Sequence, residues 1–215
     1  NDLDGSITTF FRCLRDTPEA LERAVGLTPY SLDEFTLCLE HSDDPLEEAR
    51  RVWVRSRQSF SGKAGHASDW SRSSGDSAEW RPNTSLNTEK KLLDFAKSLK
   101  GVAIDNIDAL AFIQKWAKGT STFCYLDPPY LHETRSTTKD YTHEMTKEQH
   151  GELLDLVMER SNSPDKVKFL VSGYDSELYN EKLVGFTKVL LITPLHCAKE
   201  RSKENNRTEV LWKNY

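Results

Sequence analysis

The chain has 215 residues, which is enough for one domain with a small insertion. Charged residues make up 29% of it, the mean hydropathy is −0.65 and no apolar run approaches the length of a membrane span, so the composition excludes an integral membrane protein and predicts a soluble, cytoplasmic one. The cysteines, Cys13, Cys38, Cys124 and Cys197, are scattered without a CxxC pair, which argues against a zinc site and a disulfide framework.

The net charge of −5 is unevenly distributed along the chain. Residues 1–49 include 12 acidic and 3 basic residues, whereas residues 50–82 include 7 basic and 3 acidic ones. Contacts to nucleic-acid phosphates need local basic density rather than a basic total, and the second segment can supply it. A solvated helix face followed by a polar loop explains the same pattern equally well.

Residues 1–60 predict a run of helices. Their apolar residues recur at helical spacing, and capping residues or first-turn prolines precede them, as at Thr17-Pro18 and Asp44-Pro45. Residues 61–88 are rich in Ser, Gly, Arg and Trp without periodicity, so we expect an irregular excursion there. The expected helices are one that includes Ile7, Phe10, Phe11 and Leu14, followed by Pro18–Leu27, Ser31–Leu39 and Pro45–Phe60.

Residues 89–126 predict alternating helices and strands. Val102–Ile107 alternates apolar and polar residues, which predicts a short strand that ends at Asp108. Helices are expected on either side of it, over Glu89–Leu99 and Leu110–Trp116, and a buried strand is expected over Phe123–Leu126.

That buried strand ends at Asp127-Pro128-Pro129-Tyr130. Proline cannot donate a ladder hydrogen bond, and two in a row prevent a strand or helix from continuing. A carboxylate, two carbonyls and an aromatic ring are therefore fixed at the carboxyl end of a strand, where open α/β sheets bind ligands. A carboxylate and a carbonyl can accept both hydrogens of a planar amino group, and a tyrosine ring can stack on its base. A rigid turn capped by the aspartate is the alternative.

The rest of the chain continues the alternation after a polar loop at His132–Tyr141. Alternating helices and strands indicate an α/β fold whose mostly parallel sheet is covered on both faces. The expected elements are helices over Thr146–Arg160 and Leu178–Leu183, and strands over Val167–Val171, Lys188–Thr193 and Glu209–Trp212.

Further motifs accompany the proline turn in a fixed order. They are Asn1-Asp2-Leu3-Asp4-Gly5, Leu27-Thr28-Pro29-Tyr30, Arg57-Gln58-Ser59-Phe60, Ser172-Gly173-Tyr174-Asp175 and Arg207-Thr208-Glu209-Val210-Leu211-Trp212. With the proline turn, this set resembles the Dam-related (D-twelve class) adenine-specific DNA methyltransferases, particularly their phage and prophage branch, over essentially the whole chain. The resemblance implies a Rossmann-like methyltransferase sheet in a single domain, residues 1–215, with an inserted DNA-recognition segment that we assign to residues 45–88.

The resemblance also implies S-adenosylmethionine as the cofactor. Asp2 matches the acid that binds the cofactor's ribose hydroxyls, and Asp108 matches the acid that meets its adenine amino group. An exposed terminal acid and a helix N-cap are the alternatives for these two residues. Because no Gly-rich cofactor loop precedes Asn1, we expect the chain to be an N-terminally truncated piece of such an enzyme.

In the reaction that the resemblance implies, the target adenine is flipped out of the duplex into a pocket. Tyr130 would stack on the base, while the Asp127 carboxylate and the Pro128 carbonyl accept the two amino hydrogens. The catalytic set is then Asp127, Pro128, Pro129 and Tyr130. Neither a covalent nucleophile nor a metal is needed, so we expect Cys124 to belong to the core and His143 and His150 to lie at the surface.

Residues 61–88 are the candidate DNA reader, with the end of the preceding helix. A Ser/Gly loop with Trp80 packed on the core is the alternative. The residues expected to contact DNA are Arg57, Lys63, Arg72 and Arg81 at phosphates or guanine edges, Gln58 at adenine edges, and Trp70 or Trp80 as a wedge in the base stack.

The expected partner is double-stranded DNA, bound by a monomer, with a cognate restriction endonuclease as a further partner. Two alternatives remain open at this stage. One is an inactive remnant that only binds DNA. The other is the same chemistry on cytosine, RNA or a protein glutamine, which Asp127 disfavours because relatives with those targets more often have Ser or Asn at this position.

Overall fold

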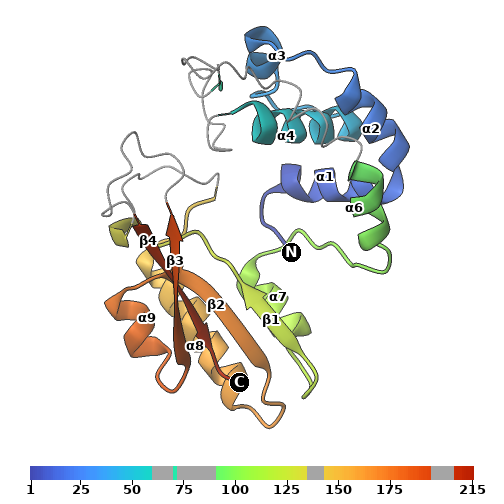
Figure 1. The fold of residues 1–215 in the computed structure, drawn as a ribbon. Helices are drawn as coiled ribbons and strands as arrows, with labels where there is room; N and C mark the ends of the chain where they lie inside the picture. Colours follow the sequence, from blue (N-terminus) through green and yellow to red (C-terminus); the bar gives the residue numbers. More distant parts are fainter. Residues whose placement is uncertain (60–69, 72–90, 135–142, 195–205) are drawn as a thin grey trace. The chain divides into compact units, whose positions relative to one another are not determined.

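The computed structural model describes residues 1–59, 70–71, 91–134, 143–194 and 206–215. Contacts divide the chain into two compact units, Asn1–Asn106 and Ile107–Tyr215, and each has its own apolar core. The first unit is helical in its described part, and the second contains the sheet (Figure 1).

The first unit contains the helices that the sequence predicts, with ends shifted by a few residues. Side-chain caps set three of the helix starts, because the Asp4, Ser31 and Asp44 side chains accept hydrogen bonds from backbone amides of the first turn. The described helices are α1 (Gly5–Asp16), α2 (Pro18–Gly26), α3 (Leu32–Leu37), α4 (Pro45–Gln58) and α6 (Leu92–Ser98).

Helix α4 organises the core of this unit by packing against α1 and α2. Its Trp53 and Val54 are buried together with Leu21, Val25 and Phe35. Burying side chains of this size contributes roughly 1.5–3 kcal/mol each, so this packing stabilises the helical unit.

The strand predicted over Val102–Ile107 is absent, and this prediction is wrong. The segment is irregular and lies beside the N-terminus, where the Asn106 amide donates to the carbonyls of Asp2 and Leu3, each at 2.9 Å. A strand needs a ladder of backbone hydrogen bonds, and here Asp2 and Asp105 share a single long one of 3.4 Å.

The second unit contains a sheet of four described strands in the order β1-β2-β4-β3 (Figure 1). Strands β1 and β2 are parallel, whereas β4 pairs antiparallel with both β2 and β3. The α/β class is confirmed, and the described sheet is mixed. The strands are β1 (Phe123–Leu126), β2 (Lys168–Tyr174), β3 (Thr187–Pro194) and β4 (Asn206–Lys213); the helices are α7 (Ala109–Trp116), η4 (His132–Thr134), α8 (Lys147–Asn162) and α9 (Glu177–Lys182).

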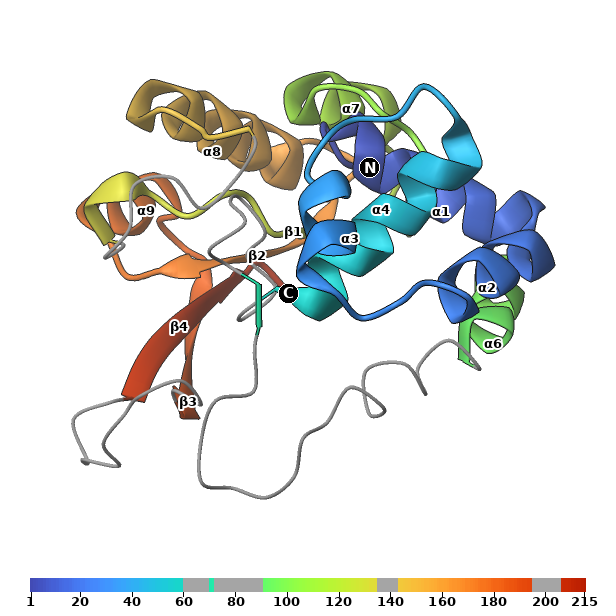
Figure 2. The same cartoon turned by 90° about the horizontal axis from the view of Figure 1, so that it is seen from above.

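The core of the second unit lies on one face of this sheet, where α7, α8 and α9 pack on Phe169, Val171 and Trp212. Figure 2 shows α8 along that side of the strands. Phe123 and Tyr125, at the edge, point to the other face and are 52% and 55% exposed. The expectations of a buried β1 and of helices on both faces are therefore wrong for the described part of this unit.

Candidate active site

The proline turn and the Ser172-Gly173-Tyr174 motif meet because β1 and β2 are parallel neighbours. Leu126 pairs with Val171, so the proline turn that follows β1 lies beside Ser172 near the carboxyl end of β2. Two motifs about 45 residues apart in sequence thereby form one site at the carboxyl ends of the strands, where α/β sheets bind ligands.

The Asp127 side chain is anchored by one of its two oxygens. Ser172 Oγ lies 2.7 Å from Asp127 Oδ1, and the Tyr125 hydroxyl donates to Ser172 Oγ over 3.3 Å. Ser172 is buried, whereas Asp127 is exposed. Within the described residues, no donor bonds to Asp127 Oδ2, so this oxygen is available to a ligand.

The two prolines hold the backbone of the turn. Pro128 is buried and Pro129 is half-buried, and neither has an amide proton to donate. No described residue donates a hydrogen bond to the Pro128 carbonyl. A carboxylate oxygen and a carbonyl oxygen from adjacent residues thus both lack a hydrogen-bond donor among the described residues.

Tyr130 packs edge-to-face against Tyr174, with ring centroids 4.7 Å apart and an interplanar angle of 76°. This geometry is favourable for aromatic pairs and fixes the orientation of the Tyr130 ring. The turn therefore presents an oriented aromatic ring close in sequence to the two acceptors.

A buried polar pair lies within the core of this unit. His150 Nδ1 and the Tyr179 hydroxyl are 3.0 Å apart, and burial, with a smaller contribution from the negative charge of Asp127, raises the pKa of Tyr179. The Tyr179 and Trp212 rings also pack close to Gly173, where a Cβ would lie in van der Waals contact with them at 3.4–3.5 Å.

The expectation that His150 lies at the surface is wrong, since its side chain is fully buried. His143 is exposed, as expected. Cys124 packs against the core, and burial raises the pKa of its thiol, which keeps it in the less nucleophilic protonated form.

The two acids expected to bind a cofactor lie in different units. Asp108 is the N-cap of α7, where its Oδ1 accepts from the amides of Leu110 and Ala111 at 2.8 and 3.3 Å. Asp2 is exposed, and its Oδ1 accepts from the Asp4 amide at 2.8 Å. In both, Oδ2 has no hydrogen-bond donor among the described residues, so each acid keeps one acceptor for a ligand hydroxyl or amino group.

Of the residues expected to contact DNA, Arg57, Gln58 and Trp70 lie in the described part. Arg57 is exposed in the last turn of α4. Gln58 is only 1% exposed, and its amide donates to the Pro29 carbonyl over 3.2 Å, so in this structure it cannot reach a base edge. The others, Lys63, Arg72, Trp80 and Arg81, lie outside the described residues.

The excursion that follows α4 is closed at its base by three contacts. Ser59 and Trp70 form an antiparallel bridge, the Ser71 amide donates to the Gln58 carbonyl over 2.7 Å, and the Tyr30 hydroxyl donates to the Ser71 carbonyl over 2.6 Å. Trp70 also contacts the Tyr30 ring and packs against the helical core. The wedge role considered for Trp70 is therefore not supported by its position.

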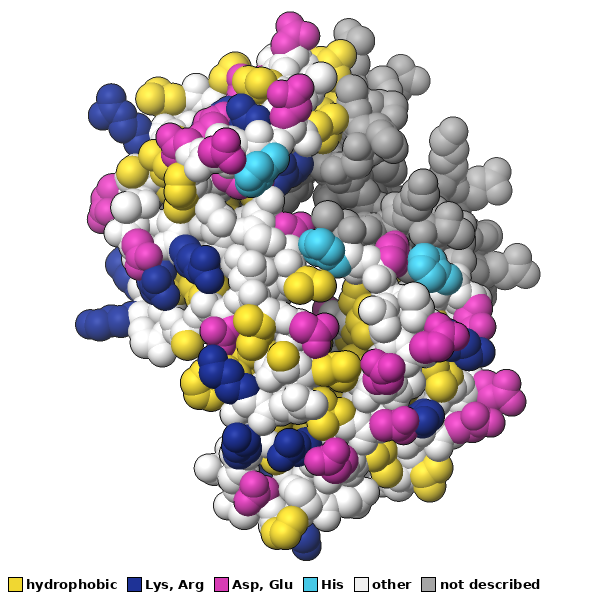
Figure 3. Space-filling view, turned by 180° about the vertical axis from the view of Figure 1, so that it is seen from behind, with side chains coloured by type: hydrophobic (Ala, Val, Ile, Leu, Met, Phe, Trp, Pro, Cys, Tyr) yellow, Lys and Arg dark blue, Asp and Glu magenta, His cyan; other side chains and the backbone are white. Residues whose placement is uncertain are grey.

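Three of the four arginines of α4 form ion pairs within the unit. Arg50 bonds Glu34 and Glu47, Arg51 bonds Glu47, and Arg55 bonds Glu48. The positive charge of these three arginines is thus neutralised by one glutamate before the helix and two in its first turn, and Arg57 is the remaining arginine of α4. On the face in Figure 3, acidic and basic side chains of the described residues are intermixed rather than segregated.

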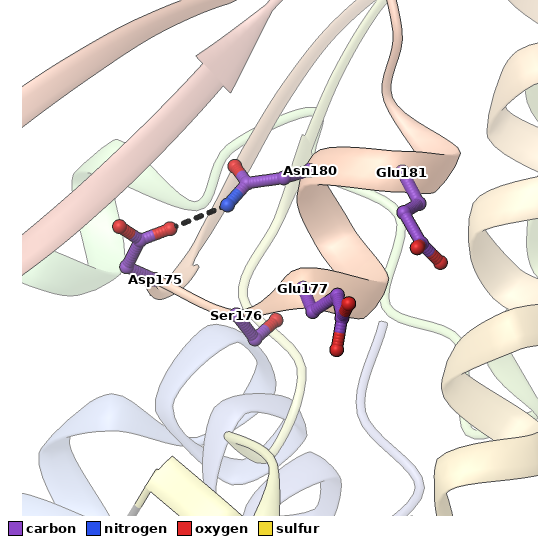
Figure 4. A pocket seen from close by; sticks show the side chains of 5 residues that line it. All are labelled: Asp175, Ser176, Glu177, Asn180 and Glu181. Carbon is purple, nitrogen blue, oxygen red and sulfur yellow. Dashed lines mark hydrogen bonds between the residues drawn. The ribbon is translucent and has the colours of Figure 1, made fainter.

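Residues that follow Tyr174 in the chain line an open surface depression of about 720 Å³ (Figure 4). Asp175 accepts hydrogen bonds from Lys188 and Asn180 there, at 2.6 and 2.7 Å, and these hold its pKa below the usual value. The carboxylates make the surface unsuitable for phosphate. Its lining residues are Asp175, Ser176, Glu177, Asn180 and Glu181.

The described residues contain neither a metal site nor a membrane span. No cluster of three or more His, Cys, Asp or Glu side chains has the arrangement of a metal site. None of the helices described has the length and apolarity needed to cross a bilayer.

The chain matches a known protein family. The model of the D12 class N6 adenine-specific DNA methyltransferases matches residues 40–193, which is more than half of the chain and includes the proline turn and Ser172-Gly173-Tyr174. No individual curated protein matches the chain.

Proposed function

Because the chain belongs to the D12 class N6 adenine-specific DNA methyltransferases, we propose that it transfers a methyl group from S-adenosylmethionine to the amino nitrogen of an adenine flipped out of duplex DNA. The family supports a role in DNA adenine methylation. The cofactor, the flipped base and the residue roles below are our proposal.

The observation that carries the proposal is the pair of acceptors beside an oriented tyrosine. Asp127 Oδ2 and the Pro128 carbonyl accept the two amino hydrogens, and Tyr130 stacks on the base, which is worth about 1–3 kcal/mol. Accepting both hydrogens favours a tetrahedral nitrogen whose lone pair can attack. Catalysis is then mainly orientation and electrostatic stabilisation.

The reaction is a single displacement. When bound, S-adenosylmethionine supplies a methyl group on a positively charged sulfur. The amino nitrogen would gain this methyl group as the carbon–sulfur bond breaks, S-adenosylhomocysteine would leave as a neutral thioether, and the extra proton on the nitrogen would pass to solvent water. Asp127 and Pro128 hold the nitrogen in position during the attack. The raised pKa of Cys124 supports a mechanism without a covalent enzyme intermediate.

For the cofactor we propose Asp2 and Asp108. A carboxylate suits vicinal ribose hydroxyls or an adenine amino group because these are hydrogen-bond donors. The available Oδ2 atoms support this assignment. N-capping by Asp108 is compatible with it because the amides of α7 bond to Oδ1.

For DNA we propose Arg57, Lys63, Arg72, Trp80 and Arg81, with Gln58 reassigned to holding the base of the excursion through Pro29. The family match runs across the boundary between the two units, which supports one methyltransferase domain working as a whole. A DNA substrate in turn suggests a cytoplasmic enzyme.

The test is titration of S-adenosylmethionine into the 215-residue chain by calorimetry, followed by transfer of a radioactive methyl group to DNA. We expect saturable binding, weakened by Asp2→Ala, and label on duplexes that contain adenine. Asp127→Ala should abolish transfer and leave cofactor binding intact. Binding to DNA without cofactor binding would favour the inactive remnant, and label on cytosine-containing DNA that lacks adenine, or on RNA, would reassign the substrate.

A further inference from the structure

The hydroxyl of Ser172 occupies a position between three oxygens. It lies 2.7 Å from Asp127 Oδ1, 3.1 Å from the Leu126 carbonyl and 3.3 Å from the Tyr125 hydroxyl. Ser172 is 3% exposed, so water does not compete for these bonds.

A serine hydroxyl has a single proton, and the neighbouring hydrogen-bond acceptors determine its direction. The Tyr125 hydroxyl donates to Ser172 Oγ, which leaves the Ser172 proton for one of two acceptors. The bond to Asp127 is shorter than the one to Leu126, and a charged acceptor makes a stronger hydrogen bond than a carbonyl. The Ser172 proton therefore points to Asp127. Tyr125 donates to Ser172 and Ser172 donates to Asp127, so the two hydrogen bonds run in the same direction.

We infer that Ser172 is a positioning residue that fixes the rotation of the Asp127 carboxylate, so that Oδ2 is the oxygen that accepts the amino hydrogen. This inference rests on the proposed methyl transfer. Asp127 is exposed and follows the end of a strand, so without this bond its two equivalent oxygens would exchange freely.

Ser172 is itself well held. It lies within β2, where its backbone is paired with Leu211 of β4, and the preceding residue, Val171, is paired with Leu126 of β1. The hydroxyl position thus depends on strand pairing on both sides and not on a loop. Such rigid support is what a catalytic carboxylate needs to stay within a fraction of an ångström of its productive position.

The test compares Ser172→Ala with Asp127→Asn, the double variant and a matched control, Ser161→Ala. The Ser161 hydroxyl bonds to the Met158 carbonyl in the last turn of α8 and touches none of these groups. We expect Ser172→Ala to lower kcat about 10- to 100-fold, the loss of one hydrogen bond to a charged group, with KM values for DNA and cofactor unchanged.

The double variant separates positioning from a structural role. If Ser172 acts through Asp127, Ser172→Ala should change kcat less than threefold in the Asp127→Asn background, and Tyr125→Phe should lower kcat of the wild type by a smaller factor than Ser172→Ala does. An unchanged kcat in Ser172→Ala, or equal losses in both backgrounds, would overturn the inference while methyl transfer by the wild type upholds the proposed function. A wild type that methylates no adenine would overturn both.

Discussion

The acid sensitivity of the helical unit follows from Glu47. Its carboxylate accepts from Arg50 and Arg51 at 2.7 and 2.8 Å, and these bonds lower its pKa from 4.5 to about 2. A folded-state pKa below the unfolded value stabilises the protein above pH 4.5. The contribution is lost as the pH falls through the range from 4.5 to about 2.

The magnitude can be worked from this shift. A change from 4.5 to about 2 corresponds to about 3 kcal/mol at most. Because the Glu47 side chain is 30% exposed, solvent screening reduces the expected loss to about 1–2 kcal/mol. Glu47→Gln should therefore destabilise the unit by about that amount at pH 6.

The assay is urea unfolding of the wild type and Glu47→Gln at pH 6 and pH 2.5, followed by tryptophan fluorescence, since Trp53 is buried in this core. Other carboxylates titrate in both proteins, so the difference between them isolates Glu47. It should shrink towards zero at the lower pH. A difference that stays constant with pH, or a variant as stable as the wild type at pH 6, would refute the reasoning.

Three further predictions concern function. Tyr30→Phe removes the hydroxyl that bonds to the Ser71 carbonyl at the base of the excursion proposed to contact DNA. KM for DNA should therefore rise about two- to tenfold, while the calorimetric Kd for the cofactor stays unchanged. Cys124→Ala should retain kcat in the methyl-transfer assay, and complete loss of activity in a folded variant would contradict the proposed mechanism. Tyr130→Ala should lower kcat/KM for DNA about 5- to 150-fold, which corresponds to the loss of ~1–3 kcal/mol of stacking, whereas Tyr130→Phe keeps the ring and should stay within about threefold of wild type.

The end of β1 at the proline turn could be predicted from the sequence because it depends on local rules. Two prolines end a strand whatever surrounds it, and the structure ends β1 at Leu126. The bond between Ser172 and Asp127 could not be predicted in the same way, because it depends on the register of β1 against β2. A register shift by one residue would turn the Ser172 side chain to the other face.

Two errors have different causes. His150 lies at helical spacing from Leu153, Leu154 and Val157, so the periodicity that identified the buried side of α8 also indicated its burial. Val102–Ile107 has the alternation but no ladder of hydrogen bonds to another strand among the described residues, and alternation alone does not form a strand. For Gln58, nothing in the sequence predicts the contact with the Pro29 carbonyl.

The ion pairs of α4 limit how strongly DNA binding can depend on salt. With Arg50, Arg51 and Arg55 bound to glutamates, the phosphate contacts proposed for residues 50–82 come from Arg57, Lys63, Arg72 and Arg81. Each phosphate contact to a duplex contributes about −0.9 to the slope of log K against log salt, so four give a slope of about −4 at most. Arg57→Ala should reduce its magnitude by about 1, while Arg51→Ala should destabilise the fold and leave the slope unchanged. A steeper slope that falls with Arg51→Ala would show that the ion pairs open to bind DNA, and a filter-binding series over salt concentration distinguishes the two cases.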